Sequence, residues 1–252
     1  MHIQKRAIAL VLAGVVSIFM TACSVDSTPI TSATNPSPVT SSCVKDISAE
    51  ISSLPAGGSI DSTGCNFNVA NTINIKKGLT ITGGTFLNTS TTGIPVFSIN
   101  TTSEVKFDGV NITGLVALVY NGDIDSDVDN STINGAVNMN LSLTNNGVIF
   151  AHDTETGAVY CTNSTSTTTG MIEWNLSTLN LPSISTGEYT AGLTDIHTNM
   201  LIDQSTVDQK NVGDVAIPLL SSTNQGYIGI YGSSLSSKTF VTDDPSNIMV
   251  FP

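Results

Sequence analysis

The chain has 252 residues, and its 20 acidic side chains outnumber its 8 basic ones, so its formal net charge at pH 7 is −12. A surface of this sign repels phosphate backbones, which excludes nucleic acid as a partner. The length beyond the N-terminal region suits one domain with a sizeable hydrophobic core.

The N-terminus has the features of an export signal. A basic start that contains Lys5 and Arg6 precedes an apolar run over residues 7–20. This pattern is typical of a cleavable signal peptide, and the apolar run is too short to cross a bilayer. The sequence therefore predicts an exported protein.

The segment Met20-Thr-Ala-Cys23 resembles the lipobox of bacterial lipoproteins. This resemblance implies that a lipoprotein signal peptide, residues 1–22, is removed and that the thiol of Cys23 is lipidated, which anchors the protein to a membrane. By the sorting rule of that family, Ser24 implies delivery to the outer membrane of a host with two membranes. An ordinary secretion signal with an incidental cysteine is the alternative.

Residues 23–42 continue from this cysteine into a stretch made almost entirely of Ser, Thr, Pro and Asn. Such a composition cannot bury enough apolar surface to offset chain entropy. We therefore expect a tether that joins the lipid anchor to a single domain over residues 43–252.

A short pattern recurs along residues 81–235: an apolar residue, then small or polar residues, then a second apolar residue five places after the first. Its first apolar positions are Ile81, Phe107, Val128, Phe150, Trp174, Ile202 and Ile230. Neighbouring members are 21 (128 − 107) to 28 (230 − 202) residues apart, and the local alternation of apolar and polar residues predicts strands. Repeats of this length correspond to one coil of a parallel β-helix, so stacking would align these positions as an inward column.

Two further columns follow from the same alignment. A polar column, which we expect to hydrogen-bond from coil to coil at a bend, contains Thr85, Asn111, Thr132, Thr154, Thr178, Thr206 and Ser234. A second inward column contains Phe86, Ile112, Ile133, Glu155, Leu179, Val207 and Leu235. Glu155 is its exception, and two interpretations stay open: a local bulge turns Glu155 to solvent, or Glu155 acts with His152 and Asp153 in a functional site.

The start of the repeat region resembles a known family. A short helix predicted over residues 44–53, the turn Leu54-Pro-Ala-Gly-Gly58 and the strand patterns at residues 72–75 and 79–86 resemble the opening of pectate-lyase-like right-handed β-helix proteins. The resemblance covers residues 44–113 and implies an all-β, single-domain right-handed parallel β-helix with a short N-terminal capping helix. Because this scaffold carries lyases, hydrolases, esterases and inert adhesins, the fold alone does not fix an activity.

Three cysteines remain after Cys23, and a disulfide is expected in an exported protein. Cys43 and Cys65 are 22 residues apart (65 − 43), which is one coil length. A bridge between them would clasp the start of the solenoid. Cys161 is then predicted to be a buried, unreactive thiol.

The strongest charged feature is a run with an acid at every second position: Asp123, Asp125, Asp127 and Asp129. In a strand these side chains would share the outward face, with Asp129 next to Asp108 and Lys106 beside Asp127. Carboxylates this close repel one another unless a cation or protons lie between them, and calcium accepts oxygen ligands of this kind. Two interpretations stay open: a solvated acidic strand, or a calcium site formed by Asp108, Asp125, Asp127 and Asp129.

Catalytic signatures of the β-helix family are missing. Its polysaccharide lyases use an Arg or Lys base, yet no arginine follows residue 22, and the pair Asp243-Asp244 lacks the other galacturonase motifs. His197 follows Asp195 with no nucleophile nearby, which favours a solvated pair. Two carboxylates can still serve a glycosidase, and the outward candidates are Asp108, Asp129, Glu173 and Asp203.

Aromatic residues that could stack on a sugar are also few. Trp174 is predicted to point inward, which leaves Tyr120, Tyr189, Tyr227 and Tyr231. The sequence therefore predicts a lipoprotein of the cell envelope whose non-catalytic β-helix serves in adhesion or in contact with a polysaccharide or surface glycan. An acid-only glycoside hydrolase on the same fold is the alternative.

Overall fold

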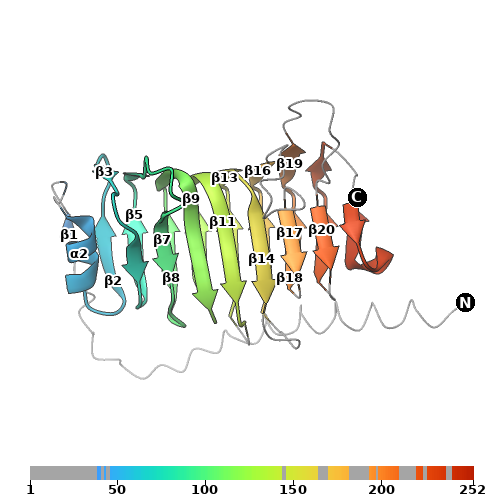
Figure 1. Cartoon of the computed structure of the whole chain (residues 1–252), viewed down its shortest axis with the longest axis horizontal. Helices are drawn as coiled ribbons and strands as arrows, with labels where there is room; N and C mark the ends of the chain where they lie inside the picture. The colour runs from blue at the N-terminus through green and yellow to red at the C-terminus, as the bar shows by residue number, and fades with distance from the viewer. Residues whose placement is uncertain are drawn as a thin grey trace, which may run out of the picture. The chain divides into compact units, whose positions relative to one another are not determined.

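The computed structural model describes residues 39–40, 43, 46–143, 146–163, 170–181, 193–196, 198–209, 220–223, 226–236 and 240–252. These residues form a right-handed parallel β-helix, in which the chain winds through successive coils (Figure 1). Several sequence predictions lie outside the described residues: the expected signal peptide, Cys23, most of the expected tether and the side chains of Asp195 and His197. Within the described part, no helix is long and apolar enough to cross a membrane.

The first face of the β-helix is a ten-stranded parallel sheet. In spatial order its strands are β1 (Val39–Thr40), β2 (Gly58–Asp61), β5 (Leu79–Thr82), β8 (Val105–Asp108), β10 (Ser126–Asp129), β12 (Val148–Ala151), β15 (Ile172–Asn175), β18 (Asn199–Asp203), β21 (Tyr227–Tyr231) and β24 (Ile248–Phe251). Strand β1 belongs to the segment expected to be a tether, and it pairs with β2.

The other two faces count as one fourteen-stranded sheet, because β9 (Asn111–Gly122) and β11 (Thr132–Leu141) run along both. The second face also holds β3 (Asn66–Asn68), β6 (Thr85–Leu87), β13 (Thr154–Thr156), β16 (Thr178–Leu181), β19 (Thr206–Gln209) and β22 (Ser234–Leu235). The third holds β4 (Ile73–Ile75), β7 (Pro95–Ile99), β14 (Val159–Asn163), β17 (Leu193–Ile196), β20 (Leu220–Thr223) and β23 (Phe240–Thr242). A Cβ on Gly135 would overlap the carbonyl oxygen of Gly114 in the neighbouring coil, so glycine is required at this corner.

From the coil of β5 to that of β21, the chain turns from the first face to the second at a residue with a left-handed backbone conformation. This column contains Gly83, Gly109, Asn130, His152, Leu176, Gln204 and Gly232. The members that are not glycine have φ between 45° and 58°, a conformation that costs such residues on the order of 1 kcal/mol. The stacking of the coils offsets this cost and fixes where each coil bends.

The first inward column is confirmed. Strand register pairs each of its seven members, from Ile81 to Ile230, with the next, and all are fully buried. Stacking brings like side chains together: the rings of Phe150 and Trp174 lie 5.2 Å apart with planes 5° from parallel. Trp174 therefore points inward, as its position in the repeat predicts.

The second inward column, from Phe86 to Leu235, is also in register. Glu155 is part of it, because only 1% of this residue is exposed and its Oε2 accepts a hydrogen bond from Trp174 Nε1 at 2.9 Å. The expectation that Glu155 turns to solvent was wrong. The alternation of β13 directs this side chain inward, where the indole of the next coil offers a donor.

A ladder of hydrogen bonds joins the coils directly after the left-handed residue. Each backbone N–H donates to a side-chain oxygen of the equivalent residue in the next coil: Val110 N to Ser131 Oγ (3.2 Å), Ser131 N to Asp153 Oδ1 (2.6 Å), Asp153 N to Ser177 Oγ (3.1 Å), Ser177 N to Ser205 Oγ (3.0 Å) and Ser205 N to Ser233 Oγ (2.9 Å). The polar column predicted from Thr85 to Ser234 lies one place later and is half-buried or exposed. That prediction was displaced by one residue, because the left-handed residue interrupts the strand alternation and turns the residue after it inward.

The N-terminal end is closed by helix α2 (Ile47–Ser53), which lies within the helix predicted over residues 44–53. The carboxylate of Asp46 caps it by accepting the N–H of the first turn at 3.0 Å. Ile47 and Ile51 are buried on the core side. At the other end of the helix, Lys77 Nζ donates to two backbone carbonyl groups, which satisfies acceptors that a helix terminus leaves free.

A disulfide joins Cys43 to Cys65, whose Cα atoms are 5.2 Å apart. The covalent clasp expected from their spacing is therefore present. Cys161 is buried and not disulfide-bonded, and its Sγ lies 3.3 Å from Thr198 Oγ1.

Replacing Ile202 by Asp should lower the free energy of unfolding by several kcal/mol, because it places an unpaired charge inside the stack. The adjacent change Asp203→Ala, on the outward side, should alter it by about 0.5 kcal/mol or less. Urea denaturation of the two variants measures the difference. Equal losses would contradict the inward assignment of Ile202.

Candidate functional site

The outward side chains of the ten-stranded sheet form two neighbouring files, which we call the outer face. The first file is Ser59, Thr80, Lys106, Asp127, Ile149, Glu173, Leu201, Gly229 and Met249. The second is Asp61, Thr82, Asp108, Asp129, Ala151, Asn175, Asp203, Tyr231 and Phe251. Successive members are about 4.8 Å apart along the stack, so groups on neighbouring coils act on one another directly.

Acids gather in the middle of the outer face. Lys106 Nζ lies 2.6 Å from Asp127 Oδ2. This hydrogen bond is the largest cause that raises the pKa of Lys106, and the charges of Asp127, Asp129 and Asp108 add to it. Asp129 pairs in register with Asp108, and its Oδ1 lies 3.0 Å from His152 Nδ1. Side chains of the protein itself therefore offset the repulsion between the carboxylates.

The calcium site expected from Asp108, Asp125, Asp127 and Asp129 stays a prediction. Asp125 lies in the loop before β10, outside the strand that carries Asp127 and Asp129. In the described part of the chain, no group of three or more His, Cys, Asp or Glu side chains is placed to hold a metal ion. Lys106 supplies a cation for Asp127, and His152 contacts Asp129.

An aromatic platform, Tyr227, Tyr231 and Phe251, lies at the C-terminal end of the outer face. The two tyrosines flank Gly229 on β21, where a Cβ would come 2.9 Å from Tyr231 Cε2 and 3.2 Å from Tyr227 Cε1. The rings therefore cover bare backbone. Tyr231 stacks on Phe251 of β24, with centroids 4.6 Å apart and planes 10° from parallel. Burial, and then the hydrogen bond with Tyr231, raise the pKa of Tyr227 to about 12, so its hydroxyl is neutral at ordinary pH.

Two acids lie on the two strands before this platform. Asp203 of β18 pairs in register with Tyr231, and Glu173 lies on β15, the next strand along. Burial raises the pKa of Glu173, and the charge of Asp203 adds to the effect, while a 3.4 Å hydrogen bond from Asn175 Nδ2 opposes it. A raised pKa is one property of a general acid. Both acids come from the set that the sequence offered for a glycosidase.

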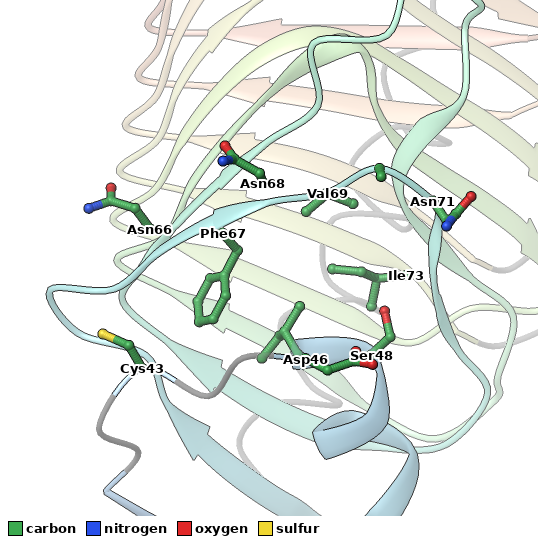
Figure 2. A pocket seen from close by; sticks show the side chains of 11 residues that line it. Cys43, Asp46, Ser48, Asn66, Phe67, Asn68, Val69, Asn71 and Ile73 are labelled. Carbon is green, nitrogen blue, oxygen red and sulfur yellow. The ribbon is translucent and has the colours of Figure 1, made fainter.

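A hollow of about 400 Å³ lies at the N-terminal end, between α2 and the first coil (Figure 2). Phe67, Val69 and Ile73 form its apolar wall. The only carboxylate among its lining residues is Asp46, which already caps the helix. The hollow therefore offers no pair of acid–base groups, and the outer face is the better candidate for function.

The tyrosines named from the sequence differ in where the structure places them. Tyr120 is fully buried, with its hydroxyl 3.5 Å from Ser126 Oγ, so its use as a stacking surface was a wrong expectation. Tyr189 lies outside the described residues. Sequence reasoning missed Phe251, which follows the last repeat that it recognised. The available signal was the apolar run at residues 248–251, one coil beyond Ile230.

In comparisons with known proteins, no family model, no curated protein and no solved structure matches the chain. The fold is therefore assigned from strand pairing, and the site from its own residues.

Changing Lys106 to Gln should destabilise the domain by about 0.5–1 kcal/mol at low salt, because the exposed pair with Asp127 is lost and the neighbouring acids repel. The loss should shrink in about 1 M salt, where these charges are screened. Chemical denaturation at both salt concentrations measures it. The exposed residue Lys76 provides the control variant Lys76→Gln, and equal effects of the two changes would contradict the assigned role of Lys106.

Proposed function

We propose that this protein is a lipid-anchored bacterial surface protein whose β-helix binds polysaccharide on its outer face without cleaving it. The aromatic platform is the observation that carries the proposal. Its rings offer an apolar surface for the C–H face of a sugar, and the hydroxyl of Tyr227 and the carboxylate of Asp203 can bond the hydroxyl rim. Tyrosine suits this use because it has an apolar body and a polar tip.

The negative charge of the outer face restricts the class of polysaccharide that can bind there. The outer face carries acids at Asp61, Asp108, Asp127, Asp129, Glu173 and Asp203, and the whole chain is strongly negative. Uronate polymers such as pectate would be repelled. The proposal therefore specifies an uncharged polysaccharide, which lies across several coils in an extended form.

Binding can be measured by affinity electrophoresis in gels that contain an uncharged soluble glucan or pectate. The protein should be retarded by the glucan only. Tyr231→Ala should weaken this retardation about tenfold, because an aromatic contact contributes about 1.5 kcal/mol.

The control is Val241→Ala, which changes an exposed apolar side chain on the third face. Equal retardation of both variants would contradict the platform as the binding site. Release of reducing sugar from the glucan, lost in Glu173→Gln, would instead favour the second candidate, an acid-only glycoside hydrolase. The raised pKa of Glu173 beside Asp203 is the observation that favours that candidate.

The anchor is proposed from the lipobox at residues 20–23 alone. Cys23→Ala should abolish incorporation of a labelled fatty acid and leave the precursor uncleaved before residue 23, because the thiol that accepts the lipid is gone. Metabolic labelling and N-terminal sequencing measure both effects. A mature N-terminus at any residue other than Cys23 in the unmodified protein would contradict the lipoprotein assignment.

A further inference from the structure

Asp153 occupies a serine position in the hydrogen-bond ladder. The neighbouring ladder residues are Ser131, Ser177, Ser205 and Ser233. Like them, Asp153 accepts the backbone N–H of the preceding coil, through Oδ1. It is 3% exposed, and its second oxygen, Oδ2, is buried with no hydrogen-bond partner.

The ladder serines also donate hydrogen bonds through their hydroxyl groups, which an ionised aspartate cannot do. Each hydroxyl also donates to the carbonyl oxygen two residues before it: Ser131 to Asp129 (2.8 Å), Ser177 to Asn175 (2.9 Å), Ser205 to Asp203 (2.7 Å) and Ser233 to Tyr231 (2.9 Å). In the coil of Asp153 the equivalent carbonyl belongs to Ala151. A carboxylate has only acceptors, whereas a carboxylic acid has one O–H donor.

Glu155, two residues later, also has one carboxylate oxygen with a hydrogen-bond partner and one without. Its Oε2 accepts the indole N–H of Trp174, while its Oε1 is buried and has no partner. A buried ionised carboxylate requires donors or a cation, and without them the neutral form is favoured.

The charged neighbours favour the neutral form as well. Asp129 and Asp127 of β10 act on Asp153 with negative charge, and so does Glu155 on the same coil once it is ionised. Lys106 is bonded to Asp127, and His152 to Asp129. Among the described residues, Tyr120 on β9 and Trp174 on β15 also lie near the pair, and their polar groups carry no charge.

We propose that Asp153 and Glu155 form a proton-binding site in the core: the folded domain holds both as neutral acids, Asp153 replaces a ladder hydroxyl, and alkaline solution weakens the β-helix by removing their protons.

The direction of the pH dependence follows from linkage. Burial, and then neighbouring charge, raise the pKa of Asp153 to about 8, and burial raises that of Glu155 to about 7. In the unfolded chain these groups ionise near pH 4. Between about pH 4 and pH 8 the folded state therefore binds more protons than the unfolded state, and stability falls as pH rises through this window.

The test is the melting temperature of the full chain and its variants at about pH 5 and pH 9. The unmodified protein should melt at least 10 °C lower at pH 9, by the usual relation between melting temperature and free energy. The double variant Asp153→Asn, Glu155→Gln should lose most of this difference, because each amide has the shape of the protonated acid and cannot ionise. It retains the acceptors for Ser131 and Trp174.

Two further variants distinguish the effect of this site on the melting temperature from the effect of the overall negative charge of the domain. Asp153→Ser restores the serine of the ladder and should by itself raise the melting temperature at pH 9. Asp208→Asn removes an exposed acid on β19 and should leave the pH difference unchanged.

A pH difference that is equal in the unmodified protein and the double variant would overturn the proposal. Infrared difference spectroscopy gives a readout that does not depend on folding stability: at pH 6 the band of a protonated carboxyl should be present in the unmodified protein and absent from the double variant. Absence of that band from the unmodified protein would equally overturn it.

Discussion

The structure depends on one constraint: successive coils stack in register, so the nearest neighbours of a side chain are its equivalents in the coils before and after it. This spacing of about 4.8 Å suits side chains that attract their own kind. The stacked rings of Phe150 and Trp174 and the ladder from Ser131 to Ser233 are its favourable results. The same constraint makes Gly135 obligatory at a corner, because the neighbouring carbonyl leaves no space for a Cβ.

Stacking also places like charges next to one another, which is unfavourable. The β-helix offsets this repulsion differently on its outer surface and in its core. Outside, Lys106 is placed among the carboxylates of the outer face, and water screens what remains. Inside, no comparable cation faces Asp153 and Glu155 among the described residues. A carboxyl group there can only be neutral or costly. The charge of the outward acids is therefore offset by pairing with other side chains. In the proposed site, the charge of the inward acids is removed by protonation.

The repeat in the sequence was sufficient to predict the fold, the two inward columns and the contact of Lys106 with Asp127, since all of these follow from register. Two predictions were wrong, and the first error arose at the turn between the first and second faces. A left-handed residue such as His152 interrupts the alternation, so the ladder lies at Asp153 and its equivalents, one place before the predicted column. The orientation of Glu155 was misjudged because polarity was given more weight than position, although the column position decided it. The aromatic platform was only partly predictable, because β24 falls outside the recognised repeat.

A stacked sheet also limits how such a surface can bind. The outer face is held by backbone hydrogen bonds on every coil, so a ligand that lies along it orders few protein groups and incurs little of the usual entropic cost. The outer face, however, has only two side chains on each coil, to which β21 adds Tyr227, and the hollow beside α2 is not lined by any of them. Under the proposed function, affinity would come from the number of coils that one extended ligand covers, with the stacked pair Tyr231 and Phe251 as the aromatic contact at one end. A polymer meets this requirement, and a small molecule does not.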